Sequence, residues 1–319
     1  MQRSELLLAS HAPFIHYGTS VKERYWNIFF ACLPAVIYGI VLFGASALGV
    51  VCLSTGSAMG WEVLFKKLRR QEPRIYDGSS ALLGLLFAMM VPATTPWWLV
   101  LVGTFLCVVV GREIYGGLGC NPVNPVLFSF AIVFMSWKNV LDFTGALGNF
   151  EVSFFPVEPL NAVKFIGASA ESKYEILELL LGKQLGGIGS VFNLGLILGG
   201  IYLAIRRFIK WEISLMFLIS IFVTALIFHI VNPTKYASPI FHLLTGYTML
   251  AAFFLLPEDT TSPVNFFPKL LYASIAGVMT ILIRNIGAYV EGVVFAILLS
   301  NVFHPLIDKI RPKSFGKGV

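Results

Sequence analysis

Long apolar runs separated by short polar stretches dominate the chain. They indicate helices, several of them shorter than the roughly 20 residues that cross a bilayer squarely. The runs that meet near residues 44 and 96 are the least clearly separated, and each pair is counted as two helices. The ten predicted helices cover about 25–43, 44–64, 80–95, 97–111, 124–137, 188–206, 211–231, 240–257, 270–287 and 291–306.

Composition places these helices in a membrane. The 319 residues are 57% hydrophobic and only 13% charged, and the mean hydropathy is +0.80. A water-soluble protein of this size cannot bury so much apolar surface, so we expect an all-α polytopic membrane protein in a lipid bilayer. The formal charge of +6 reflects orientation in the membrane and predicts no nucleic-acid partner.

The positive charges predict that orientation. If the N-terminus is cytoplasmic, most of the 23 Lys and Arg residues fall on the inner side, as the positive-inside rule requires. Both termini are then cytoplasmic. The chain divides into a cytoplasmic arm at 1–24, a first transmembrane repeat at 25–137, an outer (periplasmic) loop at 138–187, a second repeat at 188–306 and a cytoplasmic tail at 307–319.

The two halves resemble each other. Residues 84–96 end an apolar helix with Pro-Ala-Thr-Thr-Pro, and residues 246–263 end one with Pro-Glu-Asp-Thr-Thr-Ser-Pro. Arg112 and Arg284 each precede glycines and an apolar run. Five helices per half is an odd number, so we expect the second half to be inverted, with a binding site at breaks in helices. Chance similarity is the alternative.

A polar segment at 112–125 interrupts the first half. Its glycines allow tight turns or the close approach of a ligand, and its prolines stop a helix from continuing. Asparagine amides suit the edge of a flat heterocycle, whereas an ordinary loop between helices is the alternative. The candidate ligand-binding residues are Gly116, Gly117, Gly119, Asn121 and Asn124.

Charged residues at helix ends form a second group of candidates. Asp77 opens the third helix, where helix capping competes with a role in steering cations. Glu258 and Asp259 belong to a polar cluster that a solvated loop explains about equally well. These three carboxylates are the candidate ion path, and pseudo-symmetry brings Asp77 and Glu258 near one another. Arg284 and Glu291 are expected to pair across a tight outer turn.

Other kinds of chemistry have little support in the sequence. The four cysteines are scattered without metal-ligand spacing, so no metal site is predicted. No Ser-His-Asp arrangement indicates a hydrolase, and no Gly-Lys-Ser/Thr motif indicates an ATPase. We therefore assign no catalytic residue.

Five segments form a recognisable series along nearly the whole chain. They are Asp77-Gly-Ser-Ser-Ala-Leu-Leu-Gly, Tyr115-Gly-Gly-Leu-Gly-Cys-Asn-Pro-Val-Asn-Pro, Leu181-Gly-Lys-Gln-Leu-Gly-Gly-Ile-Gly, Glu258-Asp-Thr-Thr-Ser-Pro and Tyr289-Val-Glu-Gly-Val-Val-Phe-Ala-Ile-Leu-Leu-Ser-Asn. Each is weak alone. Their order and spacing resemble the family of the D subunit of the Rnf complex and the B subunit of the sodium-pumping NADH:quinone oxidoreductase, Nqr, and the length is closer to the Rnf subunit.

The resemblance implies a fold and a function. The fold is ten helices in two inverted five-helix repeats, similar to urea transporters. The function is that of one membrane subunit of a translocase, in which electron transport between reduced ferredoxin and NAD drives Na⁺ or H⁺ across the prokaryotic inner membrane. The implied partners are the A, B, C, E and G subunits. The chain is not catalytic alone, because it has no ferredoxin-type cysteine set or nucleotide fingerprint.

The resemblance also implies a flavin, either riboflavin or FMN. In relatives, the asparagines equivalent to Asn121 and Asn124 lie at a flavin within the membrane. Amide side chains and glycine-loop N–H groups can satisfy the polar edge of that ring and tune it. We add Thr261 and Ser262, from the second polar cluster, to the predicted flavin-binding residues.

One departure from the family concerns the outer loop. Relatives carry FMN on a threonine in a Ser/Thr-Gly-Ala-Thr motif, which is not intact here. Three alignments put Glu158, Leu147 or Ser169 at the acceptor position; the Glu158 alignment has the best flanks, and only the last leaves a hydroxyl. A carboxylate cannot form the same phosphoester and repels a phosphate. We therefore predict non-covalent flavin, with Ser169 as the fallback acceptor.

Two rival functions stay open at this point. One is a stand-alone secondary transporter on the same inverted-repeat scaffold, since a fold does not decide function. The other is a structural subunit of the complex without its own covalent flavin, which the missing threonine favours. A yellow protein that co-purifies with other subunits supports the pump, and a colourless homo-oligomer supports the transporter.

Overall fold

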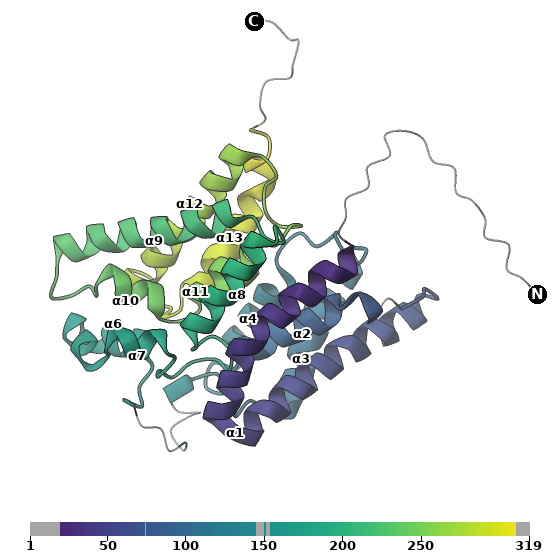
Figure 1. Cartoon of the computed structure of the whole chain (residues 1–319), viewed down its shortest axis with the longest axis horizontal. Coiled ribbons are helices and arrows are strands. Elements are labelled where there is room, and N and C mark those ends of the chain that lie inside the picture. The colour runs from purple at the N-terminus through teal and green to yellow at the C-terminus, as the bar shows by residue number, and fades with distance from the viewer. Residues whose placement is uncertain (1–19, 74, 145–149, 151–153, 311–319) are drawn as a thin grey trace, which may run out of the picture.

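The protein is built of helices. The computed structural model in Figure 1 describes residues 20–310 except 74, 145–149 and 151–153, so most of the predicted arm and tail lie outside it. Within this part of the chain every regular element is helical. This confirms the predicted all-α polytopic membrane fold. Four helical stretches are long and apolar enough to cross a membrane, namely Val21–Leu68, Trp97–Tyr115, Trp211–Val231 and Phe266–Asn285.

Helix α1, Val21–Leu68, consists of two limbs. Gly44 between them has φ 71° and ψ −152°, a conformation that a residue without Cβ adopts readily. Figure 1 shows the two limbs meeting at a sharp angle. Two helices that meet near residue 44 were predicted, and the structure confirms this. Ser20 caps the first limb, where its Oγ accepts a hydrogen bond from the Glu23 backbone N–H at 3.1 Å.

The other helices of the first half are short or interrupted. Helix α2, Ser79–Met90, has 12 residues. At 1.5 Å per residue it is about 18 Å long, well short of the roughly 30 Å hydrocarbon core. Helix α3, Trp97–Phe105, starts after Pro96 and passes into a π-helical turn at Leu106–Val110, which confirms the predicted boundary near 96. Helix α4 is Pro125–Ser136.

The second half contains one helix that the hydrophobic pattern does not show as broken. The run at 240–257 is predicted as a single helix, but the chain leaves the helical conformation at Thr245, which is extended, and at Gly246, whose φ is +67°. The run instead forms α10 (Pro239–Leu244), α11 (Thr248–Leu250) and a π-helical turn (Ala251–Leu255). The remaining helices are α8 (Asn193–Ile205), α9 (Trp211–Val231), α12 (Phe266–Asn285) and α13 (Val293–Ile307).

Short helices occupy the predicted outer loop. They are α6 (Pro159–Ile166), a 3-10 segment (Ala168–Lys173) and α7 (Ile176–Leu180). They lie toward the end of the molecule where α1 bends, in the lower part of Figure 1. We call this the outer end. The opposite end, which carries the loops after α1, α3 and α8, is the inner end. Which end faces the cytoplasm stays a prediction.

Glycines allow the two halves to approach closely. In Figure 1, α1–α4 lie on one side and α8–α13 on the other. The segment before α8 crosses to the first half, where Ile188 N–H donates to Val91 O at 3.2 Å and Gly189 N–H donates to Met89 O at 3.1 Å. A Cβ on Gly187 would lie 2.4 Å from Met89 O, so a larger residue does not fit. The Gly-Gly-Ile-Gly motif therefore positions the halves.

Helix α9 presents an exposed apolar face. Its other face packs against α10 and α12. Large exposed side chains recur at helical spacing along it, namely Leu215, Ile219, Phe222, Leu226 and Ile230. A continuous apolar face on a long helix suits the acyl chains of a bilayer.

Corresponding hydrogen bonds occur in both halves. Arg112 donates to Ser80 Oγ at 2.7 Å, and Arg284 donates to Thr248 Oγ1 at 3.0 Å. Each hydroxyl stands two positions after a glycine with positive φ. Arg112 lies at the inner end and Arg284 at the outer end, as inversion of one half requires. These bonds support the inverted repeat, which stays a prediction together with the count of ten helices.

Candidate functional site

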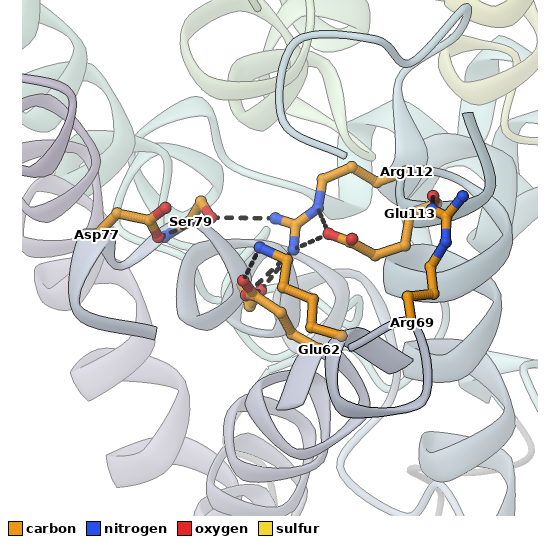
Figure 2. Close-up of polar contacts among 8 residues, drawn as sticks. Glu62, Arg69, Asp77, Ser79, Arg112 and Glu113 are labelled. Carbon is orange, nitrogen blue, oxygen red and sulfur yellow. Dashed lines mark hydrogen bonds and ion pairs between the residues drawn. The ribbon is translucent and has the colours of Figure 1, made fainter. Parts of the chain in front are cut away.

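Arg112 is the centre of a buried ion cluster at the inner end, shown in Figure 2. It is only 2% exposed. Its guanidinium donates to Glu62 Oε2 at 3.2 Å and to Glu113 Oε1 at 3.1 Å. It also donates to Ser79 Oγ at 3.1 Å and to Ser80 Oγ at 2.7 Å. The planar fork of donors makes several directed bonds at once and ties the start of the 112–125 segment to α1 and α2.

The charges of this cluster are balanced. Glu62 also accepts a hydrogen bond from Lys66 Nζ at 2.7 Å, so two carboxylates face two cations. Buried charges are tolerated when they are paired in this way. Sequence reasoning missed Glu62 and Glu113. The available signal for Glu62 was an acidic residue inside an apolar run, which is rare without a partner.

Asp77 lies at the edge of the same cluster. Its Oδ1 accepts hydrogen bonds from Ser79 N–H at 2.9 Å and from Ser79 Oγ at 2.8 Å. These contacts are the capping interactions that compete with an ion-path role. Within the described residues, no hydrogen bond or ion pair joins Asp77 to Glu258. The sequence therefore placed the two carboxylates at the same end, but the structure does not bring them into contact.

The two asparagines of the 112–125 segment join the two halves. Asn121 Nδ2 donates to Glu258 Oε1 at 3.2 Å and to Thr260 Oγ1 at 2.9 Å. Asn124 Oδ1 accepts from the backbone N–H groups of Val126 and Leu127 at 3.0 and 3.1 Å and so caps α4. Asn124 Nδ2 donates to the Leu255 carbonyl at 3.0 Å. Asn124 therefore has a structural role in this structure.

Glu258 gathers the second polar cluster around its carboxylate. Thr260 Oγ1 donates to Glu258 Oε1 at 3.1 Å, and Thr261 Oγ1 donates to Oε2 at 3.3 Å. Burial nevertheless raises the pKa of Glu258 to about 7, against the opposing effect of its hydrogen bonds from Thr260, Asn121 and Thr261. A group that titrates near neutral pH can exchange a proton with little cost in free energy.

Two other predicted residues belong to a neighbouring basic group. Asp259 forms an ion pair with Arg24, and its Oδ1 lies 3.7 Å from Lys210 Nζ. Ser262 Oγ accepts a hydrogen bond from Lys210 Nζ at 3.1 Å. Asp259 is exposed, whereas Thr261 and Ser262 are each 1% exposed. The alternative of a solvated loop therefore fits Asp259, but it does not fit Thr261 and Ser262, whose hydroxyls are buried.

A small cavity and an open loop surround these groups. The inner cavity, about 80 Å³ in volume, lies between the halves and is lined by Asn124 and Glu258 among others. Ligand pockets are commonly about 300–1,000 Å³, so this cavity does not enclose a flavin ring. Gly116, Gly117 and Gly119 do not line it; their φ values are +124°, +96° and +91°. Nothing lies within 4 Å of a Cβ placed on Gly119, so the loop backbone is open to a ligand.

The outer-loop candidates lie in two different places. Glu158 is buried and immediately precedes α6, and its backbone N–H donates to Thr144 Oγ1 at 3.4 Å. Ser169 is exposed and lines a wide groove elsewhere on the outer end. Leu147 lies outside the described residues. The predicted pair of Arg284 and Glu291 is confirmed, with Arg284 Nη2 3.0 Å from Glu291 Oε1.

Comparisons with known proteins agree with the series of motifs. A family model described as "NQR2, RnfD, RnfE family" matches residues 8–316. A protein from Pectobacterium atrosepticum, named as the D subunit of an ion-translocating oxidoreductase complex, is 31% identical over 342 residues, covering 96% of this chain and 97% of that protein. Proteins of the same name from Escherichia coli O7:K1 and Yersinia pseudotuberculosis serotype O:1b are 31% and 30% identical with the same coverage. The chain therefore belongs to the NQR2, RnfD, RnfE family.

Proposed function

We propose that the chain is the D-type membrane subunit of an Rnf-type, redox-driven ion pump. The end-to-end similarity carries this proposal, because 96% of the chain aligns with 97% of a relative named as the D subunit of an ion-translocating oxidoreductase complex. Its partners are the A, B, C, E and G subunits. The complex as a whole passes electrons between ferredoxin and NAD and moves Na⁺ or H⁺ across the prokaryotic inner membrane.

The flavin site in this proposal lies on the open side of the glycine loop. Gly116 and Gly119 are exposed and present backbone N–H and C=O groups to a ring edge. Asn121, Thr261 and Ser262 of the adjoining polar cluster are buried and bonded within the chain, so in this proposal they reach the ring only when that cluster opens to admit it. The inner cavity is too small for the ring, so a neighbouring subunit covers the other face. When bound, the flavin supplies electron transfer, and the protein orients and tunes it.

The flavin is expected to be non-covalent. When the purified complex is precipitated with acid, flavin assigned to this subunit should appear in the supernatant, and the denatured subunit should show no flavin fluorescence on a gel. The reason is that hydrogen bonds and stacking are lost on denaturation, whereas a phosphoester survives. A protein with ester-linked FMN on the same gel is the positive control.

A fluorescent band from this chain would contradict that expectation. Peptide mapping then identifies the acceptor, and the two described hydroxyls to examine are Ser169 and Thr144. Thr144 would be the more informative result, because it contacts the Glu158 backbone and would show that a neighbouring hydroxyl replaces the family's threonine.

The proposed ion path begins at Glu258, with Asp77 and Asp259 as charged groups at the same end. Glu258→Gln is expected to reduce coupled ion transport about tenfold or more, a small effect for loss of a proton-transfer group. Glutamine keeps polar atoms for the bonds with Asn121 and Thr260, so assembly of the complex should persist. Ion uptake into vesicles measures transport, and co-purification of the partners measures assembly.

Glu212→Gln is the matched control for Glu258→Gln. Glu212 is an inner-end carboxylate whose Oε1 lies 3.7 Å from Lys269 Nζ, and it does not line the inner cavity. Its substitution should leave transport near the wild-type level. Wild-type pumping by the Glu258 variant would mean that Glu258 has only a structural role, in which its hydrogen bond with Asn121 joins the two halves. Asp77→Asn tests the other proposed carboxylate in the same assay.

A structural subunit without flavin is the second candidate function. The contacts of Asn124 favour it, because both its amide oxygen and its amide nitrogen bond within the chain. A complex that pumps ions while this subunit neither releases flavin in acid nor shows a fluorescent band on the gel would support this candidate. The same acid-precipitation experiment therefore separates the two functions.

A further inference from the structure

An aromatic cavity of about 260 Å³ lies at the outer end. It is bounded by α4, by α6 and by the start of α13 with its preceding loop. Three carboxylates, Asp142, Glu158 and Glu291, also line this space. A carboxylate in aromatic surroundings is costly unless a partner compensates its charge. The aromatic lining includes Phe130, Phe134, Phe143, Tyr289 and Phe295.

Glu291 has a full set of partners. Its Oε1 lies 3.0 Å from Arg284 Nη2 and accepts from the Val293 N–H at 3.2 Å. Its Oε2 accepts from the Tyr247 N–H at 3.3 Å. Arg284 Nη1 also donates a hydrogen bond to the His242 carbonyl at 2.8 Å. The charges of Glu291 and Arg284 therefore cancel, and Arg284 forms its ion pair with Glu291 and not with Glu158.

Glu158 lacks such a counter-charge. Its carboxylate accepts a hydrogen bond from the Asn161 amide, and no Lys or Arg of the described chain forms an ion pair with it. Lys164 Nζ instead donates to the carbonyls of Gly287 and Tyr289 at 2.7 Å each. The cavity as a whole is thus left with an uncompensated carboxyl group.

None of the other charged and titratable groups around Glu158 in the described chain forms an ion pair with it. Lys138 and Asp142 also line the cavity and carry opposite charges. Tyr174 donates its hydroxyl to the Val157 carbonyl at 3.0 Å, and Tyr247 donates its hydroxyl to the Met90 carbonyl at 2.6 Å. Both phenols are therefore occupied as donors to the backbone.

A second, smaller void adjoins two of the same carboxylates. Its volume is about 10 Å³, and Glu158, Glu291 and Tyr247 line both spaces. Gln184 lines this void and is 2% exposed. Its Nε2 donates to the Leu244 carbonyl at 3.0 Å, while its Oε1 has no partner among the described atoms. A buried acceptor without a donor calls for an explanation such as a bound ion.

We propose that Glu158 and the side-chain oxygen of Gln184 bind a small monovalent cation, a proton or Na⁺, at the outer end. An uncompensated carboxylate and an unpaired amide oxygen supply negative charge and lone pairs but no donor, which suits a cation and disfavours an anion. The site deepens the proposed function, since it provides an outer counterpart of Glu258 in the ion path. The ion enters from the aromatic cavity and reaches the void beside Gln184.

The electrostatics of the loop agree with this assignment. Burial, together with Glu291 and Asp142, raises the pKa of Glu158 from 4.5 to about 8, against the smaller opposing effects of Arg284 and of the Asn161 hydrogen bond. The folded chain therefore holds this proton more tightly than the unfolded chain does. Stability from this proton is present at acidic pH and is lost as the pH rises from about 4.5 through about 8.

The test is a titration of the purified full-length chain in detergent. Infrared difference spectra between acidic and alkaline pH should show the loss of a protonated carboxyl band, with a midpoint near pH 8. Glu158→Gln should lose the step near pH 8 and keep that of Glu258 near pH 7, and Glu158→Asp should keep its own step at a shifted pH. Glu171→Gln is the control, because Glu171 lies in the same loop, bonds Ser238 N–H at 2.9 Å and does not line the aromatic cavity.

Repeating the titration with Na⁺ in place of N-methylglucamine distinguishes the two cations. A shift of the midpoint to lower pH means that Na⁺ competes for the site, and an unchanged midpoint means that the site takes protons only. An unchanged titration in folded Glu158→Gln overturns the proposal, and buried Cys32 and Cys107 that resist a thiol reagent report folding. No partner, flavin or transport is needed, so failure of the pump assignment leaves this result interpretable.

Discussion

Replacing Arg112 with glutamine is expected to lower the free energy of unfolding by about 3–5 kcal/mol, the cost of removing one partner from a buried ion pair. Glu62 and Glu113 are 1% and 2% exposed, and without the guanidinium both carboxylates stay buried, with Lys66 as the remaining cation on Glu62. The start of the 112–125 segment also loses its bonds to Ser79 and Ser80. We expect disordering of this segment before the rest of the chain unfolds.

Thermal unfolding followed with a thiol-reactive dye measures this effect. Cys32 and Cys107 are 0% exposed and react only when the helices open, whereas Cys52 and Cys120 are exposed from the start. The dye signal therefore has a defined baseline and a defined unfolding step.

Two further variants make the test of Arg112 specific. Arg69→Gln is the matched control, because Arg69 is exposed and its side chain donates to the Glu113 carbonyl at 3.1 Å without contacting the buried carboxylates. Its loss should change stability by less than about 1 kcal/mol. Combining Arg112→Gln with Glu113→Gln should recover part of the stability, because Glu113 is the carboxylate that loses its cation, whereas Glu62 keeps Lys66. Equal losses in the single and double variants would mean that the charge balance is not what stabilises the cluster.

Replacing Gly39 with alanine is expected to cost about 3 kcal/mol or more, the upper part of the range for overpacking a core. Gly39 lies in the first limb of α1, where a Cβ would be 1.8 Å from the Ile188 carbonyl oxygen and 2.8 Å from its carbonyl carbon. Backbone atoms cannot rotate away as a side chain does. Either α1 or the segment before α8 must move, which disturbs the contact between the halves.

Gly49→Ala is the control for this substitution, and its expected effect has the opposite sign. Gly49 lies in the second limb of the same helix, and nothing is found within 4 Å of a Cβ placed there. Alanine in an open helical position should stabilise the protein by about 0.5–1 kcal/mol. The dye assay described for Arg112 measures both variants. If both glycines responded alike, α1 would not pack against the segment before α8 as the structure shows.

Local properties explain why the sequence predicted the helices well. Hydropathy is a property of each segment, so the apolar runs locate the helices wherever these pack. The bend at Gly44 lay at a weak point of the pattern. The break at Gly246 could not be predicted from the pattern. The flanking residues stay apolar, and one glycine inside a helical run is an ambiguous signal. Its left-handed conformation became visible only with the chain folded around it.

The candidate site was predicted in its composition but not in its pairings. Asn121 and Glu258 were each singled out, and the structure joins them across the halves at 3.2 Å. Asn124 was predicted to face a flavin, yet it caps α4 and bonds the Leu255 carbonyl. An asparagine before Pro at a helix start is also a common cap. The sequence alone did not decide between the two roles.

The sequence by itself determined that this is a polytopic helical membrane protein of the NQR2, RnfD, RnfE family, because hydropathy and motif order are written along the chain. Only the tertiary structure decided which buried charges are compensated. Arg112 forms an ion pair with Glu62, 50 positions away, and Arg284 forms one with Glu291. Glu158 instead accepts a hydrogen bond from the neutral Asn161 amide. Charge compensation depends on distances of a few ångströms between residues far apart in sequence, and folding alone sets those distances.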